Sequence, residues 1–210
     1  MPNKISGPDF SLGDQASCKT KFVEPSGTNG SRQRTIICIL IFLTAFGVRL
    51  VVWQNQRTDA QQVQTGVTQN YKHLARLIRQ NGLRSFFYRS SSTSNPDLLG
   101  HPPGYSLLLA LIYRIVGESD RAVQMFQIFC DSLCAVINVL IATELLPFGV
   151  GALAGFMAAF APQFSWNSIL LLPDTLAAFP ILIAIYLIIR ALKRPFWLTM
   201  LVAGGCIGLS

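Results

Sequence analysis

Charged residues are scarce in this chain. Asp, Glu, Lys and Arg make up only 13% of its 210 residues, whereas soluble domains usually carry about 25%. Hydrophobic residues make up 51%, and they gather in long blocks. This composition argues against a soluble domain and indicates a polytopic membrane protein.

The patterns of several other protein classes are also missing. No apolar core occupies the first ~15–30 residues, where a secretory signal peptide would have one. No repeat of fixed period and no nucleic-acid motif is visible, so no nucleic-acid partner is expected. The five cysteines form no metal or redox pattern and are interpreted as small packing residues. The only histidines, His73 and His101, lack a carboxylate cluster, so we expect neither a metal site nor a cofactor.

The apolar blocks predict an all-α, polytopic transmembrane helical bundle. Residues 1–34 are polar and rich in Gly, Pro and Ser, which predicts a disordered cytoplasmic tail. The helical domain is predicted over residues 35–210, with a long polar outer loop over residues 54–103. The predicted spans are Thr35–Trp53, Ala122–Leu146, Phe148–Phe164 and Ile169–Ile189, and a further apolar helix begins at Pro195. Gly151 and Gly155 suit close helix packing.

A short apolar stretch, Gly104–Gly117, decides the topology. It gives only about 21 Å of helix, while a bilayer core needs about 30 Å. We therefore predict a re-entrant or interfacial helix that begins at Pro103, whose missing N–H is not needed there. The basic cluster Arg190–Arg194 should be cytoplasmic. If the short helix does not span, three further crossings after the first helix bring Arg190–Arg194 to the cytoplasmic side.

The outer loop is predicted to carry an amphipathic helix. Apolar side chains recur at helical spacing, Thr58 or Asp59 could cap its start, and Asn81-Gly82 could cap its end. Such a helix lies on the membrane surface, packs on the bundle, or does both. Its apolar face would be Val63, Val67, Tyr71, Leu74 and Ile78, with Lys72, Arg76 and Arg79 on the other faces.

The predicted outer loop is basic, which opposes the positive-inside tendency. Either the topology is inverted, or the loop keeps its charge for an anionic partner, and we favour the second interpretation. Basic and aromatic residues at an interface suit a phosphate head group on a lipid.

Three acids lie in or beside the predicted spans. Asp174 follows Pro173 near the outer end of its helix, and an acid there needs a cavity or a partner. We favour a functional role for Asp174, and the alternative is a structural polar contact. Asp131 is interpreted as a helix–helix hydrogen bond, and Glu144 as interfacial.

Two stretches carry a family resemblance: "LGHPPGYSLLLALIYRIVGESDRAVQMFQ" from Leu99 and "ALAGFMAAFAPQFSWNSILLLPDTLAAF" from Ala152. With the order of elements above, the chain resembles the polyprenyl-phosphate-dependent membrane glycosyltransferases of the GT-C superfamily. It is most similar to the bacterial branch related to protein mannosyltransferases and to the lipid A aminoarabinose transferase. The resemblance covers roughly residues 35–210.

The resemblance implies a sugar transferred from a polyprenyl-phosphate donor, itself a substrate, to a lipid, glycan or protein acceptor. An acid in the first outer loop would act as general base on the acceptor hydroxyl, and basic residues would stabilise the leaving phosphate. The family acid precedes the Tyr of "TQNYKHLA" by three residues, where this chain has Thr68. Either Asp59 supplies the carboxylate or the base is lost. The candidate site residues are Asp59, then Asp174, for catalysis, and Arg84, Arg89, His101 and Tyr105 for substrate binding.

The same resemblance implies an integral protein of the bacterial inner membrane with a cytoplasmic N-terminus. Because the chain stops within an apolar helix, it is interpreted as the N-terminal portion of a longer enzyme. Two alternatives remain: a non-catalytic subunit that binds polyprenyl phosphate, and a transporter, which would need paired broken helices near the midplane.

Overall fold

The computed structural model describes residues 28–63, 66–82 and 103–209, and within these ranges every regular element is an α-helix. This confirms the predicted all-α class. The helices are α1 (Thr28–Val63), α2 (Gly66–Asn81), α5 (Pro103–Val116), α6 (Asp120–Leu145), α7 (Phe148–Phe160), α8 (Pro162–Ile169), α9 (Pro173–Lys193) and α10 (Trp197–Leu209).

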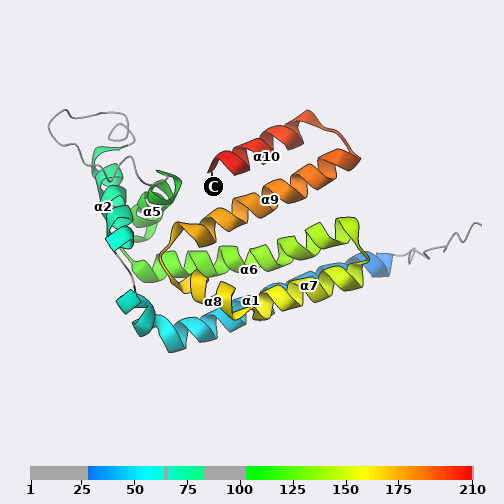
Figure 1. Ribbon diagram of the computed structural model, residues 1–210, viewed down its shortest axis with the longest axis horizontal. Coiled ribbons are helices and arrows are strands. Elements are labelled where there is room, and N and C mark those ends of the chain that lie inside the picture. Colours follow the sequence, from blue (N-terminus) through cyan, green and yellow to red (C-terminus); the bar gives the residue numbers. More distant parts are fainter. Residues whose placement is uncertain (1–27, 64–65, 83–102, 210) are drawn as a thin grey trace, which may run out of the picture.

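The long helices form a bundle in which α1, α6, α7 and α9 run in alternating directions (Figure 1). In the described part, Gly30–Gln56 of α1, α6 and α9 are each long and apolar enough to cross a membrane. The α7–α8 pair passes the same test as one broken span, bent by 52°. The predicted span Phe148–Phe164 is therefore interrupted, because Pro162 cannot continue α7 and instead opens α8.

Helix α1 extends beyond its predicted span at both ends. Residues 28–34 are helical rather than part of a tail, while residues 1–27 lie outside the described residues. The predicted loop start at residue 54 is also wrong, because residues 54–63 contain no Gly or Pro and continue the helix. Asp59 consequently lies near the end of α1 and does not cap α2, which begins at Gly66.

Helices α2 and α5 pack on each other at one end of the bundle, here called the α2–α5 end (Figure 1). Both end at a glycine with positive φ, 71° at Gly82 and 86° at Gly117, a conformation that costs glycine little. The N–H of Gly82 donates to the Ile78 carbonyl at 2.8 Å, which confirms the predicted cap. Helix α5 has only 14 residues and begins at Pro103, as predicted, and it is too short to count among the spans.

Close packing in the bundle depends on small residues of α7. A Cβ placed on Gly155 would lie 2.3 Å from Val139 Cγ2 and 3.3 Å from the Ala135 carbonyl oxygen of α6. One placed on Gly151 would lie 2.7 Å from Thr143 Cγ2. The two glycines therefore set the distance between α6 and α7, as their spacing predicted.

A buried ion pair joins α1 to α6 in the middle of the bundle. The Arg49 guanidinium, 1% exposed, donates through Nε to the carboxylate of Asp131. Its Nη1 also donates to the backbone carbonyls of Ala45 and Ala159, at 3.1 and 3.3 Å. This confirms the interpretation of Asp131 as a helix–helix contact, because a buried charge must be paired.

Candidate functional site

The link between α8 and α9 sets the geometry of the α2–α5 end. Its backbone carbonyls leave the helical ladder, and side chains satisfy them. Gln124 Nε2 donates to the Ile169 carbonyl at 2.8 Å, and Gln127 Nε2 donates to that of Leu172 at 3.1 Å. Thr68 Oγ1 of α2 donates to the Leu171 carbonyl at 3.3 Å. Irregular backbone in a membrane protein needs such partners, and they hold the start of α9 beside α2.

This link also explains why α9 begins later than predicted. Pro173 occupies the first turn of α9, where a missing N–H costs nothing. The residue before a proline is disfavoured in helical conformation, and Leu172 is extended, as is Leu170. Asp174 follows in the same first turn and is exposed. A carboxylate at this position is favoured by the positive end of the helix dipole.

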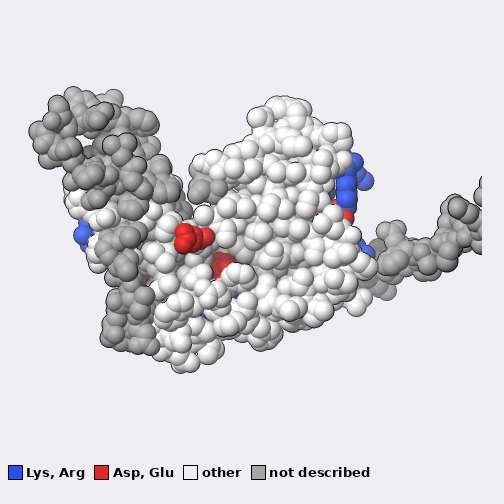
Figure 2. Space-filling model, viewed as in Figure 1, with Lys and Arg blue, Asp and Glu red and all other residues white. Residues whose placement is uncertain are grey.

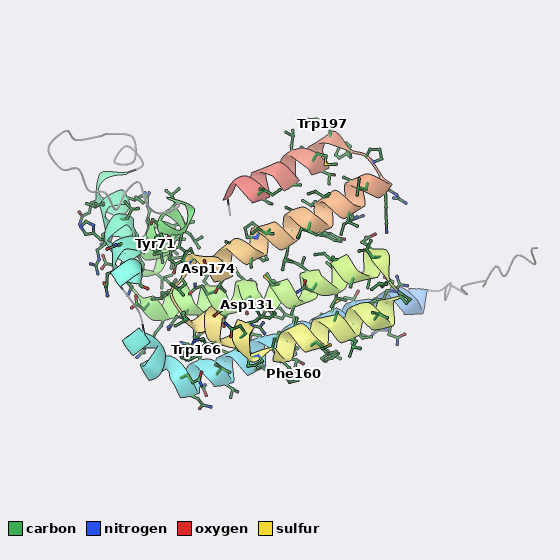
Figure 3. All side chains as sticks on the ribbon, in the orientation of Figure 1. Tyr71, Asp131, Phe160, Trp166, Asp174 and Trp197 are labelled. Carbon is green, nitrogen blue, oxygen red and sulfur yellow. The ribbon has the colours of Figure 1, made fainter. Side chains whose placement is uncertain are left out.

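Asp174 lies near Tyr71 of α2, and Figure 3 shows both at the α2–α5 end. Burial first, and then the charge of Asp174, raise the pKa of the Tyr71 hydroxyl. Asp174 itself forms no hydrogen bond or ion pair with any residue that the structure describes. An exposed carboxylate without a partner in the described part is able to accept a hydrogen bond from a hydroxyl group.

Next to Tyr71 lies a group of buried polar atoms. The rings of Tyr71 and Tyr105 meet edge to face, with centroids 5.0 Å apart. Burial raises the pKa of Tyr105, and the adjacent Gln127 side chain opposes that shift. Within the described part, the Tyr105 hydroxyl and Gln127 Oε1 are buried beside each other without a well-formed hydrogen bond, and Ser106 Oγ, on the same helix as Tyr105, is also buried without one. Buried polar atoms in native proteins normally have partners, so this group has unused capacity to bind a ligand or water.

A separate cavity of about 480 Å³ lies where α2 and α5 meet the start of α6. Its charges are largely paired: Lys72 Nζ lies 2.6 Å from Asp120 Oδ2, and Arg76 Nε lies 3.1 Å from Glu118 Oε2. Arg79, next to this cavity, also pairs with Glu118, at 2.9 Å. Three of the cations that were counted for an anionic partner are therefore paired with acids and fasten α2 to the α5–α6 turn. For the basic residues of 83–102, which lie outside the described residues, that expectation stays a prediction.

Lys72 also departs from the predicted helix face. It is only 8% exposed, although the hydrophobic pattern assigned it to a polar face. The pattern correctly predicted the burial of Tyr71, Leu74 and Ile78. Lys72 is tolerated beside them because Asp120 neutralises its ammonium group.

The predicted site residues have different outcomes. Tyr105 and Asp174 are brought together around Tyr71. Asp59 lies on the last turns of α1, and its side chain is outside the described part. Arg84, Arg89 and His101 all lie outside the described residues.

Sequence reasoning missed Tyr71 and Gln127 as site residues. The available signal was their polarity within apolar helix faces: Tyr71 belongs to "TQNYKHLA", and Gln127 ends the first of the two resembling stretches. The described residues contain no group of three or more His, Cys, Asp or Glu side chains that could hold a metal ion.

These features define an integral membrane protein with a polar site at one end of a helical bundle. The model of the dolichyl-phosphate-mannose-protein mannosyltransferase family matches residues 100–210, just over half of the chain. The chain therefore belongs to this family of membrane glycosyltransferases, and the resemblance to the GT-C superfamily is confirmed. No curated protein and no solved structure matches the chain. The matched region contains Tyr105, Gln127 and Asp174.

Proposed function

We propose that this protein transfers a sugar from a polyprenyl-phosphate donor to a hydroxyl of a lipid, glycan or protein acceptor. The reaction would take place at the α2–α5 end. The observation that carries the proposal is the exposed carboxylate of Asp174 near Tyr71, whose ring contacts Tyr105. Asp174 and Tyr105 lie within the region matched by a glycosyltransferase family.

The direction of the bundle supports an outward-facing site. The start of α1, with Arg32 and Arg34, lies at the end opposite α2 and α5 (Figure 1). The basic residues Arg190–Arg194 lie at that opposite end too. With the Arg190–Arg194 cluster placed on the cytoplasmic side, that end and the N-terminus face the cytoplasm, in the inner membrane of a bacterium, although the described residues of the α2–α5 end carry as many Lys and Arg.

In the proposed reaction the acceptor oxygen attacks the anomeric carbon of the sugar. The bond from that carbon to the phosphate oxygen breaks, and the lipid phosphate leaves with the electron pair. The hydroxyl proton passes to a carboxylate, which acts as general base. Asp174 and Asp59 are the two candidates for this carboxylate, and Tyr105 and Gln127 would offer hydrogen bonds to the sugar.

The charge that develops on the leaving phosphate needs nearby cations. Arg84, Arg89 and His101 are proposed for this role, because the α2 cations already have acidic partners. No divalent metal or other cofactor is included in the proposal.

The test is transfer of labelled sugar from polyprenyl-phosphate donors in membranes that contain the full chain. Asp174→Asn is expected to lower the rate by about 10²–10⁴-fold if Asp174 is the base. Asp59→Asn is compared in the same assay and distinguishes the two candidates. Glu118→Gln is the matched control, because it removes an acid at the same end that is already paired with Arg76 and Arg79. Full transfer by Asp174→Asn, Asp59→Asn and the double variant would overturn the assignment of the base.

One observation favours a second candidate function, non-catalytic binding of polyprenyl phosphate. Thr68 stands at the family's acid position, is 1% exposed, and uses its hydroxyl on the Leu171 carbonyl. Absence of transfer by the wild-type chain across a panel of donors, with retained binding of polyprenyl phosphate, would support this role. A transporter would need paired broken helices, and α7–α8 is the one bent pair within the described ranges.

A further inference from the structure

A second polar site lies at the opposite end of the bundle, far from the proposed reaction. A cavity of about 530 Å³ opens where the end of α6 faces the turn from α9 to α10. Its volume lies within the range of roughly 300–1,000 Å³ that is usual for small-molecule pockets. Its charged lining consists of Arg190, Lys193 and Arg194, with Glu144 as the single acid.

The charges of this cavity are unequally paired. Lys193 Nζ lies 2.7 Å from Glu144 Oε2 and donates to the Glu144 carbonyl oxygen at 2.5 Å. Lys193 therefore neutralises the acid and caps the end of α6. Two guanidinium groups, those of Arg190 and Arg194, are left without an acidic partner among the residues described.

The two arginines have room to bind an anion. Arg190 stacks on the Tyr186 ring, with its Cζ 5.7 Å from the centroid, and donates to the Tyr186 hydroxyl at 3.4 Å. This contact orients the guanidinium and leaves most of its five N–H donors available. The Arg194 side chain is exposed and has no partner in the described part. Guanidinium groups bind phosphate through paired hydrogen bonds.

Exposed apolar side chains lie next to the charged lining residues along the chain. Leu192, Phe196 and Trp197 are 76%, 55% and 70% exposed, and Phe196 lines the cavity itself. Figure 2 shows the basic group at this end of the molecule, beside a surface without charge. An exposed Trp next to basic residues at the end of a spanning helix is typical of the membrane–water interface. A soluble anion would make no use of these apolar side chains, whereas a lipid would contact them with its acyl chains.

We infer that this cavity binds the phosphate head group of an anionic membrane phospholipid. Arg190 and Arg194 hold the phosphate, Lys193 and Glu144 shape the cavity, and Phe196 and Trp197 lie against the acyl chains. Basic pockets between membrane helices bind anionic head groups for the same electrostatic reason. The site does not depend on the proposed sugar transfer and lies at the other end of the bundle.

The test is native mass spectrometry of the full chain, released from micelles with equal amounts of phosphatidylglycerol and phosphatidylcholine. The wild type should retain phosphatidylglycerol in preference. Since each Lys or Arg near a membrane surface favours an anionic lipid roughly fivefold, Arg190→Gln with Arg194→Gln should lower that preference by at least about fivefold. The preference should also fall as salt concentration rises.

Two further variants separate the specific site from general charge and from misfolding. Arg114→Gln with Arg121→Gln removes the same charge from exposed residues at the α2–α5 end and should leave the preference within about twofold of wild type. Arg190→Lys with Arg194→Lys keeps the charge and should retain much of the preference. Equal losses in both glutamine pairs, or no loss in either, would overturn the site.

A final arm distinguishes a lipid head group from free phosphate. Inorganic phosphate is added against chloride at the same ionic strength. If the occupant is a lipid, its acyl-chain contacts remain, so phosphatidylglycerol should stay bound in preference to phosphatidylcholine in both salts. Loss of that preference in phosphate but not in chloride would overturn the lipid assignment in favour of a soluble phosphate.

Discussion

The two ends of the bundle both carry basic side chains, but they use them differently. At the α2–α5 end, Lys72, Arg76 and Arg79 are paired with Asp120 and Glu118. At the opposite end, Glu144 pairs with Lys193, while Arg190 and Arg194 have no acidic partner among the described residues. The α2 cations, which the sequence predicted to be available to an anionic partner, are thus paired, whereas Arg190 and Arg194 are not; at the α2–α5 end, Arg114 and Arg121 also lack an acidic partner in the described part.

This difference shows that the number of charges in a segment does not identify an anion site. The acids that neutralise α2 are 39 or more residues away in sequence, since Glu118 lies 39 positions from Arg79 and 42 from Arg76, and Asp120 lies 48 positions from Lys72. A count of charges within the predicted outer loop, residues 54–103, does not include these acids. Pairing in three dimensions decides which cations remain available to a ligand.

The largest expected effect concerns the bundle that separates the two ends. Asp131→Ala leaves the Arg49 guanidinium buried without its partner, which should destabilise the protein by about 3–5 kcal/mol. Replacing both partners, Arg49→Met with Asp131→Leu, should recover much of that loss, because no unpaired charge remains. Thermal unfolding in detergent micelles measures both. Equal melting temperatures for the single and double variants would contradict a structural ion pair.

The next effect concerns α7, whose contact with α6 connects the two ends. Gly155→Ala should destabilise by about 1–3 kcal/mol, because its Cβ meets Val139 and the backbone of α6. Gly149→Ala in the same helix is the control, since nothing lies within 4 Å of its Cβ. That change should be neutral or stabilising by up to about 1 kcal/mol. Similar unfolding temperatures for the two variants would disprove close packing at Gly155.

A smaller loss of stability should distinguish the two sets of ion pairs that hold α2, Lys72 with Asp120 and Arg76 and Arg79 with Glu118. The Lys72 side chain is 10% exposed, so Asp120→Asn weakens the compensation of a nearly buried ammonium group and should cost about 1–2 kcal/mol. Glu118→Gln breaks pairs that solvent screens and should cost less than about 1 kcal/mol. Unfolding at low and high salt checks the order. A greater loss of stability from Glu118→Gln than from Asp120→Asn would contradict this order.

The smallest effect at neutral pH concerns Tyr113 on α5. Burial, followed by the charge of Asp120, raises the pKa of Tyr113 to about 12. An ordinary tyrosine titrates near pH 10, so the unfolded chain ionises first. The contribution of Tyr113 to stability is therefore complete below about pH 10 and is lost as the pH rises toward 12. Tyr113→Phe should flatten this part of the stability curve, and an unchanged slope would contradict the shift.

Much of the fold could be predicted from local patterns. The span of α6 was predicted to within two residues at its start and one at its end. A long apolar run with polar residues at both ends forms a membrane-spanning helix in most cases. The caps at Pro103 and Gly82 followed from backbone chemistry that depends on those residues alone. The end of α1 was not predictable from hydropathy, because helix formation continues past the apolar stretch.

The candidate site was harder to predict for a different reason. The sequence predicted Asp174 for catalysis and Tyr105 for substrate binding, and both lie near Tyr71, which was assigned only to an apolar face; Gln127 was assigned no role. Whether Asp59 joins them stays a prediction. Side chains from α2, α5, α6 and α9 meet at this place, and no spacing along the chain encodes that meeting.

The sequence by itself determined that this protein is a helical membrane protein, where most of its spans lie, and which family it belongs to. These properties depend on local hydropathy, on glycine and proline chemistry, and on ordered motifs. Only the tertiary structure decided that the α2 cations are neutralised, that Arg49 and Asp131 pair inside the bundle, and that Arg190 and Arg194 have no acidic partner among the described residues. The physical reason is that electrostatic energy depends on distances of a few ångströms between residues that lie far apart in the chain.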